Sequence, residues 1–184
     1  MSIQNLNKIF DPHRVAVIGA SDTPTSVGYT VLRNLVGSGF RGVVYPVNAK
    51  RESVQGIQAY KDIESLPHAP DLAVICTPSP TVPGLVRSLG EAGTRGIVII
   101  SAGFREIGAE GRKLEEQVLA EKAKFSGMRI LGPNCLGIIV PGICLNASFA
   151  AATPQKGHIG FISQSGALCT SVLDWAIDEG IGFS

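Results

Sequence analysis

The sequence has little charge, few aromatic residues and almost no net charge, and each shortage excludes a class of protein. Of the 184 residues, 17% are charged and 6% are aromatic, and the formal net charge is +1. Disordered chains need the opposite balance of high charge and few apolar residues, whereas 45% of this chain is hydrophobic. Without a basic surface or interleaved aromatics, the chain is not expected to bind nucleic acid or an anionic membrane.

Signals for a membrane or an oxidising compartment are also lacking. No apolar run approaches the about 18–20 residues of a membrane-spanning helix, and no signal peptide with a charged and then an apolar part opens the sequence. The four cysteines form no C-x-x-C pair, and three of them fall in or beside apolar runs, where a buried reduced thiol is the common state. These absences predict a cytoplasmic protein without a membrane partner.

Motifs for metal binding or catalysis are missing as well. There is no H-x-x-x-H, H-E-x-x-H or Cys/His cluster, so no metal site is predicted. No pair of carboxylates is placed for acid–base chemistry. The string Ser163-Gln164-Ser165-Gly166 contains two serines but lacks the G-x-S-x-G elbow of a serine nucleophile. No catalytic machinery is complete in this sequence.

What the sequence does have is a regular alternation of apolar runs and segments of helical period. Strands are predicted at residues 15–18, 43–47, 72–76, 97–100 and 129–131. Helices are predicted near residues 27–38, 81–92 and 108–125, with a brief helical turn within 56–66. Alternating strands and helices indicate the α/β class with a doubly wound parallel sheet, and a mean hydropathy of +0.24 suits strands buried on both faces.

The alternation stops near residue 140 and starts again later. Residues 1–140 are interpreted as one domain, and residues 141–156 as a linker. A strand at 158–162 and a helix at 167–179 then open a second domain, which covers residues 157–184. A single βα unit cannot bury both of its faces alone, so the rest of this domain is expected in a longer chain or on a partner.

The first strand ends in a turn that suits a phosphate group. Gly19 follows the strand, and the Ser/Thr/Asp-rich residues 20–26 lead to Gly28 and a helix. In a βαβ unit such a turn presents backbone N–H groups and a helix N-terminus to an anion. The spacing departs from G-x-G-x-x-G, so the turn indicates a phosphate-bearing ligand without identifying a dinucleotide.

The end of the second strand argues against NAD as that ligand. No Asp or Glu follows this strand, and Asn48 and Lys50 stand in its place. A carboxylate here would favour the free 2′-hydroxyl of NAD, whereas a cation favours a phosphorylated ribose. An ordinary solvated surface lysine is the other interpretation of Lys50, and the sequence leaves both open.

Small polar loops follow all five predicted strands. Because parallel strands with right-handed crossovers end at one edge of a sheet, we expect these loops to meet there and to hold a ligand. The loops are residues 19–26, 48–50, 77–80, 101–103 and 132–137.

The fifth loop, residues 132–137, has the unusual sequence Gly-Pro-Asn-Cys-Leu-Gly. It is either a tight turn with Cys135 as a packing thiol, or a loop whose Asn134 side chain and backbone donors polarise a carbonyl or phosphoryl group. A nucleophilic Cys135 would need a base or a lowered pKa. All three histidines lie at predicted strand starts or in loops away from this edge, which disfavours that role.

A series of strings along the chain is distinctive when taken in order. They are Ala16-Val-Ile-Gly-Ala-Ser21, Tyr45-Pro-Val-Asn48 with Lys50, Ala73-Val-Ile-Cys-Thr-Pro78, Ile100-Ser-Ala-Gly103, Leu131-Gly-Pro-Asn-Cys-Leu-Gly137, Leu145-Asn-Ala-Ser-Phe149 and Phe161-Ile-Ser-Gln-Ser-Gly166. In this order they resemble the NDP-forming acyl-CoA synthetases, the superfamily of succinyl-CoA synthetase and ADP-forming acetyl-CoA synthetase. The resemblance covers essentially the whole chain, but only the N-terminal part of the family's architecture.

The resemblance implies a Rossmann-like CoA-binding domain over residues 1–140, followed by the first βα unit of a flavodoxin-like, succinyl-CoA synthetase-like domain. Coenzyme A is the implied cofactor. Its implied binding residues are Gly19, Ala20, Ser21, Asp22, Thr23, Pro24, Asn48, Lys50, Thr77, Pro78, Ile100, Ser101 and Ala102. Asn134 and Cys135 are implied to lie near the thioester. The implied phosphohistidine-binding loop consists of Ser163, Gln164, Ser165 and Gly166.

In such enzymes an acyl phosphate and CoA give acyl-CoA, and phosphate passes to NDP through a phosphohistidine. That histidine, and the ATP-grasp domain with its ADP/ATP and Mg, match nothing in these 184 residues. The resemblance therefore implies an ATP-grasp domain or subunit as partner, an oligomer as one possible assembly, and no activity for this chain alone.

Two alternatives stay open at this stage. Protein-lysine acetyltransferases carry a similar CoA-binding domain, so the chain is also readable as the regulatory domain of such an enzyme. An NADP-binding oxidoreductase domain is the third interpretation, and it rests only on the fold and on Lys50.

Overall fold

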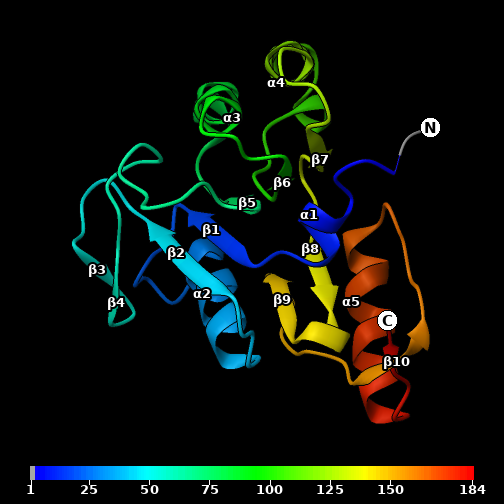
Figure 1. Cartoon of the computed structure of the whole chain (residues 1–184). Helices are drawn as coiled ribbons and strands as arrows, with labels where there is room; N and C mark the ends of the chain where they lie inside the picture. The colour runs from blue at the N-terminus through cyan, green and yellow to red at the C-terminus, as the bar shows by residue number, and fades with distance from the viewer. Residues whose placement is uncertain (1–2) are drawn as a thin grey trace.

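The computed structural model describes residues 3–184 and contains one open sheet of five parallel strands (Figure 1). In chain order they are β1 (Arg14–Ile18), β2 (Val43–Val47), β5 (Leu72–Ile75), β6 (Gly96–Ile99) and β7 (Arg129–Leu131). Their spatial order is β2-β1-β5-β6-β7, and every neighbouring pair is parallel. The predicted α/β class with a Rossmann-like parallel sheet is confirmed, with strand ends within about one residue of those expected.

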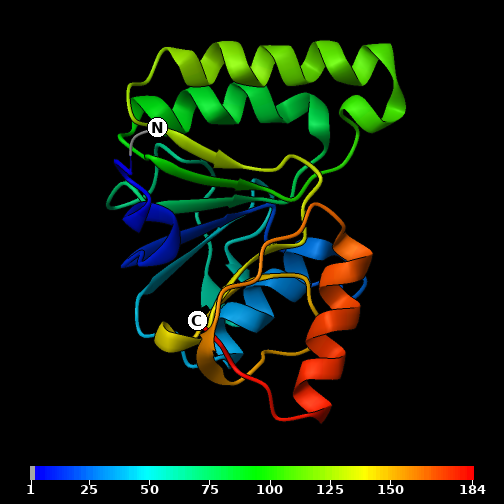
Figure 2. The same cartoon turned by 90° about the vertical axis from the view of Figure 1, so that its right-hand side faces the viewer.

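Helices cover both faces of this sheet. They are α1 (Asn7–Phe10), α2 (Val27–Gly37), α3 (Val82–Glu91) and α4 (Ala109–Ala123), with 3-10 turns η1 (Ser79–Thr81), η2 (Arg105–Ile107) and η3 (Pro141–Ile143). Helices α3 and α4 lie side by side on one face, and α2 lies on the other (Figures 1 and 2). No helix among residues 3–184 has the length and apolar character needed to cross a membrane.

The core consists of two apolar layers separated by the sheet. Because successive residues of a strand point to opposite faces, Val15 and Val17 pack with α2, whereas Ala16 and Ile18 pack on the side of α3 and α4. All of β1 after Arg14 is buried, as are β5 and β6 throughout. Burial on both faces explains why the strands are short continuous apolar runs rather than alternating ones.

A hairpin stands where the sequence predicted a turn of helix. Strands β3 (Ser53–Val54) and β4 (Ile57–Gln58) pair antiparallel, so the prediction of a helical turn within 56–66 was wrong. Gln55 and Gly56 form the tip with φ of 51° and 76°, and two-residue hairpin turns with positive φ at both central positions match the twist of the strands. Val54 is fully buried in the core and anchors the hairpin.

The range predicted as a linker, residues 141–156, contains regular structure. Strand β8 (Gly137–Val140) pairs antiparallel with β9 (Leu145–Ser148), and β9 lies buried against α2. The polar residues of β9 suggested a loop, but Asn146 donates to Thr153 Oγ1 at 2.7 Å, and Ser148 Oγ donates to Asn146 Oδ1 at 2.6 Å. These bonds satisfy the polar groups, so burial of β9 is tolerated. The division into domains at residues 1–140 and 157–184 stays a prediction.

The C-terminal unit consists of β10 (Lys156–Ile159) and α5 (Gly166–Asp178). Both elements were expected, although β10 begins and ends two or three residues earlier than the predicted strand. Helix α5 packs against the β8–β9 hairpin through a small cluster that includes Leu173, Ala176 and Phe183. Large apolar side chains stay exposed here, with Ile162 at 95% and Trp175 at 57%.

Candidate functional site

The carboxyl ends of the parallel strands meet at one edge, and the strand order marks a particular place on it. If the hairpin strands are left out, the order is 2-1-3-4-5, in which the chain leaves β1 and β5 towards opposite sides. Ligands of open α/β sheets bind at such a switch point. The gap between the ends of β1 and β5 is therefore the expected place for a ligand.

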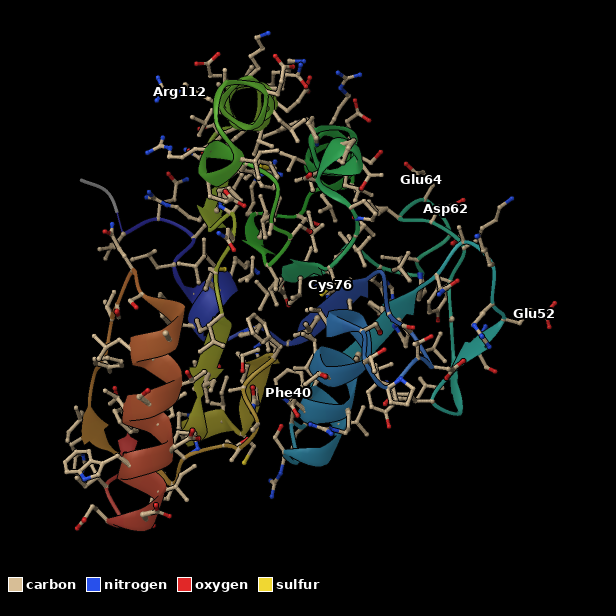
Figure 3. All side chains as sticks on the ribbon, turned by 180° about the vertical axis from the view of Figure 1, so that it is seen from behind. Phe40, Glu52, Asp62, Glu64, Cys76 and Arg112 are labelled. Carbon is tan, nitrogen blue, oxygen red and sulfur yellow. The ribbon has the colours of Figure 1, made fainter. Side chains whose placement is uncertain are left out.

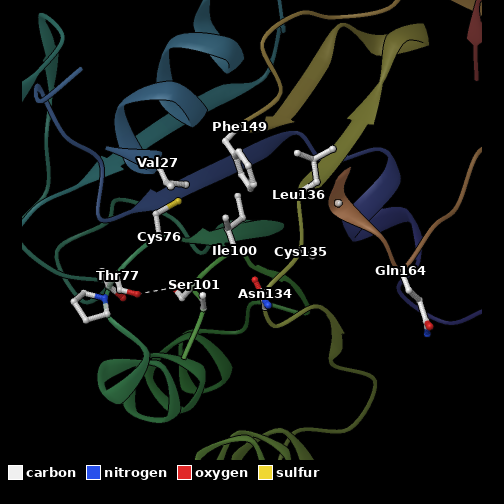
Figure 4. A pocket seen from close by; sticks show the side chains of 13 residues that line it. Val27, Cys76, Thr77, Ile100, Ser101, Asn134, Cys135, Leu136, Phe149 and Gln164 are labelled. Carbon is white, nitrogen blue, oxygen red and sulfur yellow. Dashed lines mark hydrogen bonds between the residues drawn. The ribbon is translucent and has the colours of Figure 1, made fainter. Parts of the chain in front are cut away.

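A cavity of about 560 Å³ opens at this edge (Figure 4). Its lining combines hydroxyl, amide and apolar groups and comes from both halves of the chain. The residues are Val27, Cys76, Thr77, Pro78, Ile100, Ser101, Ala102, Asn134, Cys135, Leu136, Phe149, Gln164 and Gly166. A volume of this size is ordinary for a small-molecule site.

The cavity gathers some of the predicted site residues and leaves others beside it. Those that line it are Thr77, Pro78, Ile100, Ser101, Ala102, Asn134, Cys135, Gln164 and Gly166. Those that do not are Gly19, Ala20, Ser21, Asp22, Thr23, Pro24, Asn48, Lys50, Ser163 and Ser165. The other four lining residues, Val27, Cys76, Leu136 and Phe149, were not predicted as site residues, because nothing in a local pattern separates them from core residues.

The turn after β1 lies directly beside the cavity and requires glycine at two places. Gly19 has φ of 88°, and a Cβ there would lie 2.9 Å from Thr77 Cγ2. A Cβ on Gly28 would lie 1.9 Å from the Gly19 carbonyl oxygen. The start of α2 is thus pressed against the end of β1, with the first amides of the helix lacking intrahelical acceptors.

The β3–β4 hairpin holds this turn from outside. The Gln55 side chain donates to the Ser21 carbonyl at 3.1 Å and to the Tyr29 carbonyl at 3.0 Å, and its backbone N–H donates to Asp22 Oδ1 at 2.7 Å. Arg51 pairs with the Asp22 carboxylate at 3.0 Å. The charge of Asp22 is therefore compensated within the protein, which removes an acidic repulsion from a turn that would face phosphate.

Asn48 and Lys50 have different roles in the structure. The Asn48 amide donates to the Ala20 carbonyl at 2.8 Å, and its oxygen accepts the Lys50 N–H at 2.9 Å. The side chain of Asn48 is therefore used inside the protein, where it ties the end of β2 to the turn after β1. The Lys50 side chain is exposed, and within residues 3–184 it makes no ion pair, so its cation is free to meet an anionic ligand.

The loops after β5, β6 and β7 are joined to one another and to β6 by hydrogen bonds to backbone carbonyls. Ser101 Oγ donates to the Thr77 carbonyl at 2.5 Å, the bond drawn in Figure 4. Asn134, with φ of 52°, donates its N–H to the Ser101 carbonyl at 3.0 Å, and the Cys135 thiol donates to the Ile99 carbonyl at 3.3 Å. These contacts fix the backbone at Asn134, whose side-chain amide lines the cavity (Figure 4).

Both thiols of the cavity are poor nucleophiles. Burial raises the pKa of Cys135 to about 11 and that of Cys76 to about 12. Figure 3 shows Cys76 in the interior between the sheet and α2, while labelled charged residues such as Arg112 point outward. Of the residues that the structure describes, no histidine lines the cavity. Without a base, Cys135 stays a neutral packing thiol with a weak donor.

The loop before α5 reaches the same cavity from the other side. Ser165 caps α5, since its hydroxyl accepts the Leu168 N–H at 3.2 Å, and Ser163 Oγ accepts the Ser165 N–H at 3.0 Å. Gln164 and Gly166 line the cavity together with Ser101 and Asn134 of the sheet loops. The described residues hold no cluster of His, Cys, Asp and Glu that suits a metal ion.

Two families match this chain over separate ranges. The family described as "CoA binding domain" matches residues 13–141, and the family described as "Succinyl-CoA ligase like flavodoxin domain" matches residues 156–184. The first range covers well over half of the chain and includes all five parallel strands. The chain belongs to the CoA-binding domain family. Coenzyme A is accordingly the ligand that these matches support.

Curated relatives and solved structures agree with this assignment. The chain is 47% identical over 179 residues to the alpha subunit of an ADP-forming acetate–CoA ligase II from Pyrococcus furiosus, and covers 38% of it. It is 44% identical to an ADP-forming acetate–CoA ligase I from Archaeoglobus fulgidus, of which it covers 26%. Each alignment takes in 97% of this chain, which therefore spans less than half of these relatives.

Two solved structures share the fold closely. A crystal structure of a Pyrococcus horikoshii protein has a TM-score of 0.92 at 46% identity, over 97% of this chain and 40% of that one. A dinucleotide-forming acetyl-coenzyme A synthetase 1 from Ca. Korarchaeum cryptofilum, in complex with phosphate and ADP, has a TM-score of 0.89 at 39% identity, over 96% of this chain and 38% of that one.

Proposed function

We propose that this chain is the CoA-binding portion of an ADP-forming acyl-CoA synthetase. One observation carries the proposal: a single cavity is lined by the strand-end loops of the CoA-binding family and by Gln164 and Gly166 of the succinyl-CoA ligase-like unit. A thioester-forming enzyme needs the CoA thiol and an activated acyl group in one place. The names of the relatives, all CoA ligases, support the same reading.

The parts of CoA can be assigned to the site by their chemistry. The phosphates suit the turn at residues 19–26, where α2 begins, and Lys50 supplies a cation for the phosphorylated ribose. The pantetheine arm then enters the cavity along Ile100 and Ser101. At its end the thiol would lie near Asn134, whose amide is placed to hydrogen-bond a carbonyl or phosphoryl oxygen.

The chain holds the acceptor of the acyl group rather than the groups that activate it. In the proposed reaction the CoA thiol attacks an acyl phosphate, the thioester forms, and inorganic phosphate leaves. Cys135 takes no covalent part, because burial keeps its thiol protonated. In this direction the phosphate of the acyl phosphate would come from NTP by way of a phosphohistidine, and NDP would be released. That histidine and the ATP-grasp site would be supplied by other parts of the same protein or by a partner subunit.

The loop at residues 163–166 is proposed to hold that phosphohistidine. Its residues surround the N-terminus of α5, a helix of 13 residues, and helix N-termini favour anions. Two of its residues, Gln164 and Gly166, line the cavity where phosphate would be released. The same loop would then serve both the acyl phosphate and the phosphorylated histidine.

Calorimetric titration of the chain with CoA and with NADP tests the ligand. We expect CoA to bind and NADP to bind much more weakly or not at all. Tight binding of NADP without binding of CoA would overturn the proposal in favour of an oxidoreductase domain. To test the reaction, the protein that carries this chain is given ATP, acetate and CoA, and the expected products are acetyl-CoA, ADP and phosphate.

The relatives found do not support the alternative interpretation, the regulatory domain of a protein-lysine acetyltransferase. It would bind CoA as well, so the titration does not separate the two. Transfer of an acetyl group from acetyl-CoA to a lysine peptide by the protein that carries this chain, without formation of ADP, would favour the acetyltransferase. The ligase names of relatives at 41–47% identity favour the synthetase.

A further inference from the structure

Phe149 is an aromatic side chain held in place at the edge of the cavity while 40% exposed. It directly follows β9, within the range that the sequence predicted as a linker. Figure 4 shows its ring between Val27 and Leu136, directed to the same space as Ile100. What distinguishes Phe149 from other exposed apolar residues is its place in the cavity lining, where the open part of the ring offers apolar area that a ligand could cover.

The backbone on both sides of Phe149 is fastened by one side chain. The amide of Asn34 donates to the Ser148 carbonyl at 3.0 Å and to the Ala150 carbonyl at 2.9 Å. The N–H of Phe149 donates to the Leu136 carbonyl at 3.3 Å. Together these bonds use the main-chain groups of three successive residues, which leaves the Phe149 segment little freedom to swing out of the cavity.

Asn34 also connects this segment to the phosphate turn. It lies on α2, about two helical turns after Val27, and α2 begins at the Ser26 cap of that turn. Val27 itself lines the cavity. One short helix therefore positions the turn for the phosphates at its first residues and the Phe149 ring further along.

We propose that Phe149 is the apolar wall against which the pantetheine arm of CoA packs, and that Asn34 is the positioning residue that holds this wall. The inference rests on the proposed function, since it takes CoA as the ligand of the cavity. The arm is an apolar chain interrupted by two amides, and the nearby wall offers Val27, Ile100, Leu136 and Phe149 as apolar contacts. Asn34 acts through Phe149 and makes no ligand contact itself.

A comparison of two ligands isolates the contribution of the pantetheine arm to the binding affinity. They are CoA and adenosine 3′-phosphate 5′-diphosphate, which is CoA without the pantetheine arm. In calorimetric titrations of the chain, Phe149→Ala is expected to weaken CoA binding about tenfold, the effect of losing a buried aromatic contact. The affinity for adenosine 3′-phosphate 5′-diphosphate is expected to stay unchanged. Phe149→Leu is expected to lie between the wild type and Phe149→Ala.

A second phenylalanine with a similar exposed fraction provides a matched control. Phe161 is 39% exposed, almost the same as Phe149, but lies outside the cavity lining. Phe161→Ala is expected to leave both affinities unchanged. Equal losses for the two ligands with Phe149→Ala, or no loss for either, would overturn the inference while the proposed function stands.

The positioning role of Asn34 is tested by two substitutions that remove its hydrogen-bond donors in different ways. Asn34→Asp sets a carboxylate against two carbonyl oxygens, whereas Asn34→Ala only removes the donors. Both are expected to weaken CoA more than adenosine 3′-phosphate 5′-diphosphate, with the larger discrimination in Asn34→Asp. A merely structural residue would lower the thermal midpoint and reduce both affinities alike, which would overturn its positioning role. A wild-type chain that binds neither ligand would overturn the proposed function and this inference together.

Discussion

Two helices of this chain begin in the same way and end up in different surroundings. Ser26 caps α2 and Ser165 caps α5, and in both cases the hydroxyl accepts the N–H of the third residue on, at 3.2 Å. Gly28, the second residue of α2, lies so close to the Gly19 carbonyl that no side chain fits there. By contrast, nothing lies within 4 Å of a Cβ placed on Gly166, the first residue of α5. Local sequence sets where a helix begins, and packing decides how tightly its first turn is held.

The same contrast holds for the two units as a whole. The five-stranded sheet and the helices on its two faces form one unit, the sheet unit. In it α2 lies over a closed core that includes Leu32 and Leu35, both fully buried. In the C-terminal unit α5 rests on a small cluster and exposes Leu168 at 51% and Trp175 at 57%. Such apolar exposure is expected where further protein covers the surface. The sheet unit is closely packed, whereas the C-terminal unit leaves large apolar side chains open to solvent.

The largest test of this contrast replaces a leucine in each unit. Leu32→Ala removes a fully buried side chain from the layer between α2 and the sheet, so it is expected to lower the free energy of unfolding by about 2–5 kcal/mol. Leu168→Ala, on the exposed face of α5, is expected to change it by less than about 0.5 kcal/mol. Urea denaturation followed by circular dichroism measures both. Equal losses would show that the two units are packed alike.

The second test replaces the glycine near the start of each helix, Gly28 in α2 and Gly166 in α5. In Gly28→Ala the new methyl group would lie 1.9 Å from the Gly19 carbonyl oxygen, so α2 must move; we expect a loss of about 1–3 kcal/mol and weaker CoA binding. Gly166→Ala meets no neighbour and is expected to be neutral or stabilising by up to about 1 kcal/mol, because alanine favours helices over glycine. Urea denaturation and CoA titration of both variants check this. A well-tolerated Gly28→Ala would contradict the close packing of α2.

The sheet unit was largely predictable from sequence because its signals are local and repeated. Short apolar runs predicted all five parallel strands. Because such strands end at one edge of a sheet, the loops of Thr77, Ser101 and Asn134 were correctly predicted to lie together. The hairpin tip at Gln55 and the strand β9 were missed. Their strand partners are only a few residues away, but the contacts that hold them in place come from distant segments, α2 for β9 and the turn after β1 for Gln55. No local pattern contains those contacts.

The site shows the same division between local and distant causes. Polar residues at strand ends could be predicted as ligand-binding residues. In the structure, however, Asn48 donates to the Ala20 carbonyl and Asp22 forms an ion pair with Arg51. The apolar wall at Phe149 could not be nominated, because its orientation comes from Asn34, which lies 115 residues earlier by their numbers. Sequence therefore located the edge of the sheet, and the contacts across it determined which side chains face the ligand.

A charge reversal in each unit gives a smaller effect. Lys50→Glu places a carboxylate where the ribose phosphate is expected, so CoA binding should weaken about tenfold, which corresponds to about 1.4 kcal/mol. Dephospho-CoA should be affected less. Lys156→Glu, at an exposed position of β10, is the matched control and should leave both affinities unchanged. Equal losses for CoA and dephospho-CoA with Lys50→Glu would place the lysine away from the 3′-phosphate.

The smallest expected effect is a dependence of stability on pH that belongs to the sheet unit. Hydrogen bonds from Arg87 and Lys124 lower the pKa of Glu121 from 4.5 to about 2. For Asp71 burial acts to raise the pKa, but Lys8 and the N–H groups of His13 and Arg14 outweigh it and lower the pKa. Among the residues that the structure describes, no ion pair lies in the C-terminal unit.

The sign of the pH effect follows from these lowered pKa values. A carboxyl whose pKa is depressed on folding stabilises the protein fully above its unfolded value near 4.5, and this contribution disappears as the pH falls towards about 2. The effect is small because Arg87 and Lys124 are both 55% exposed. Urea midpoints are expected to agree between pH 7 and pH 5 and to fall below pH 4, with a shallower fall in Glu121→Gln. An unchanged slope in Glu121→Gln would show that the Glu121 pairs do not contribute to the stability of the sheet unit.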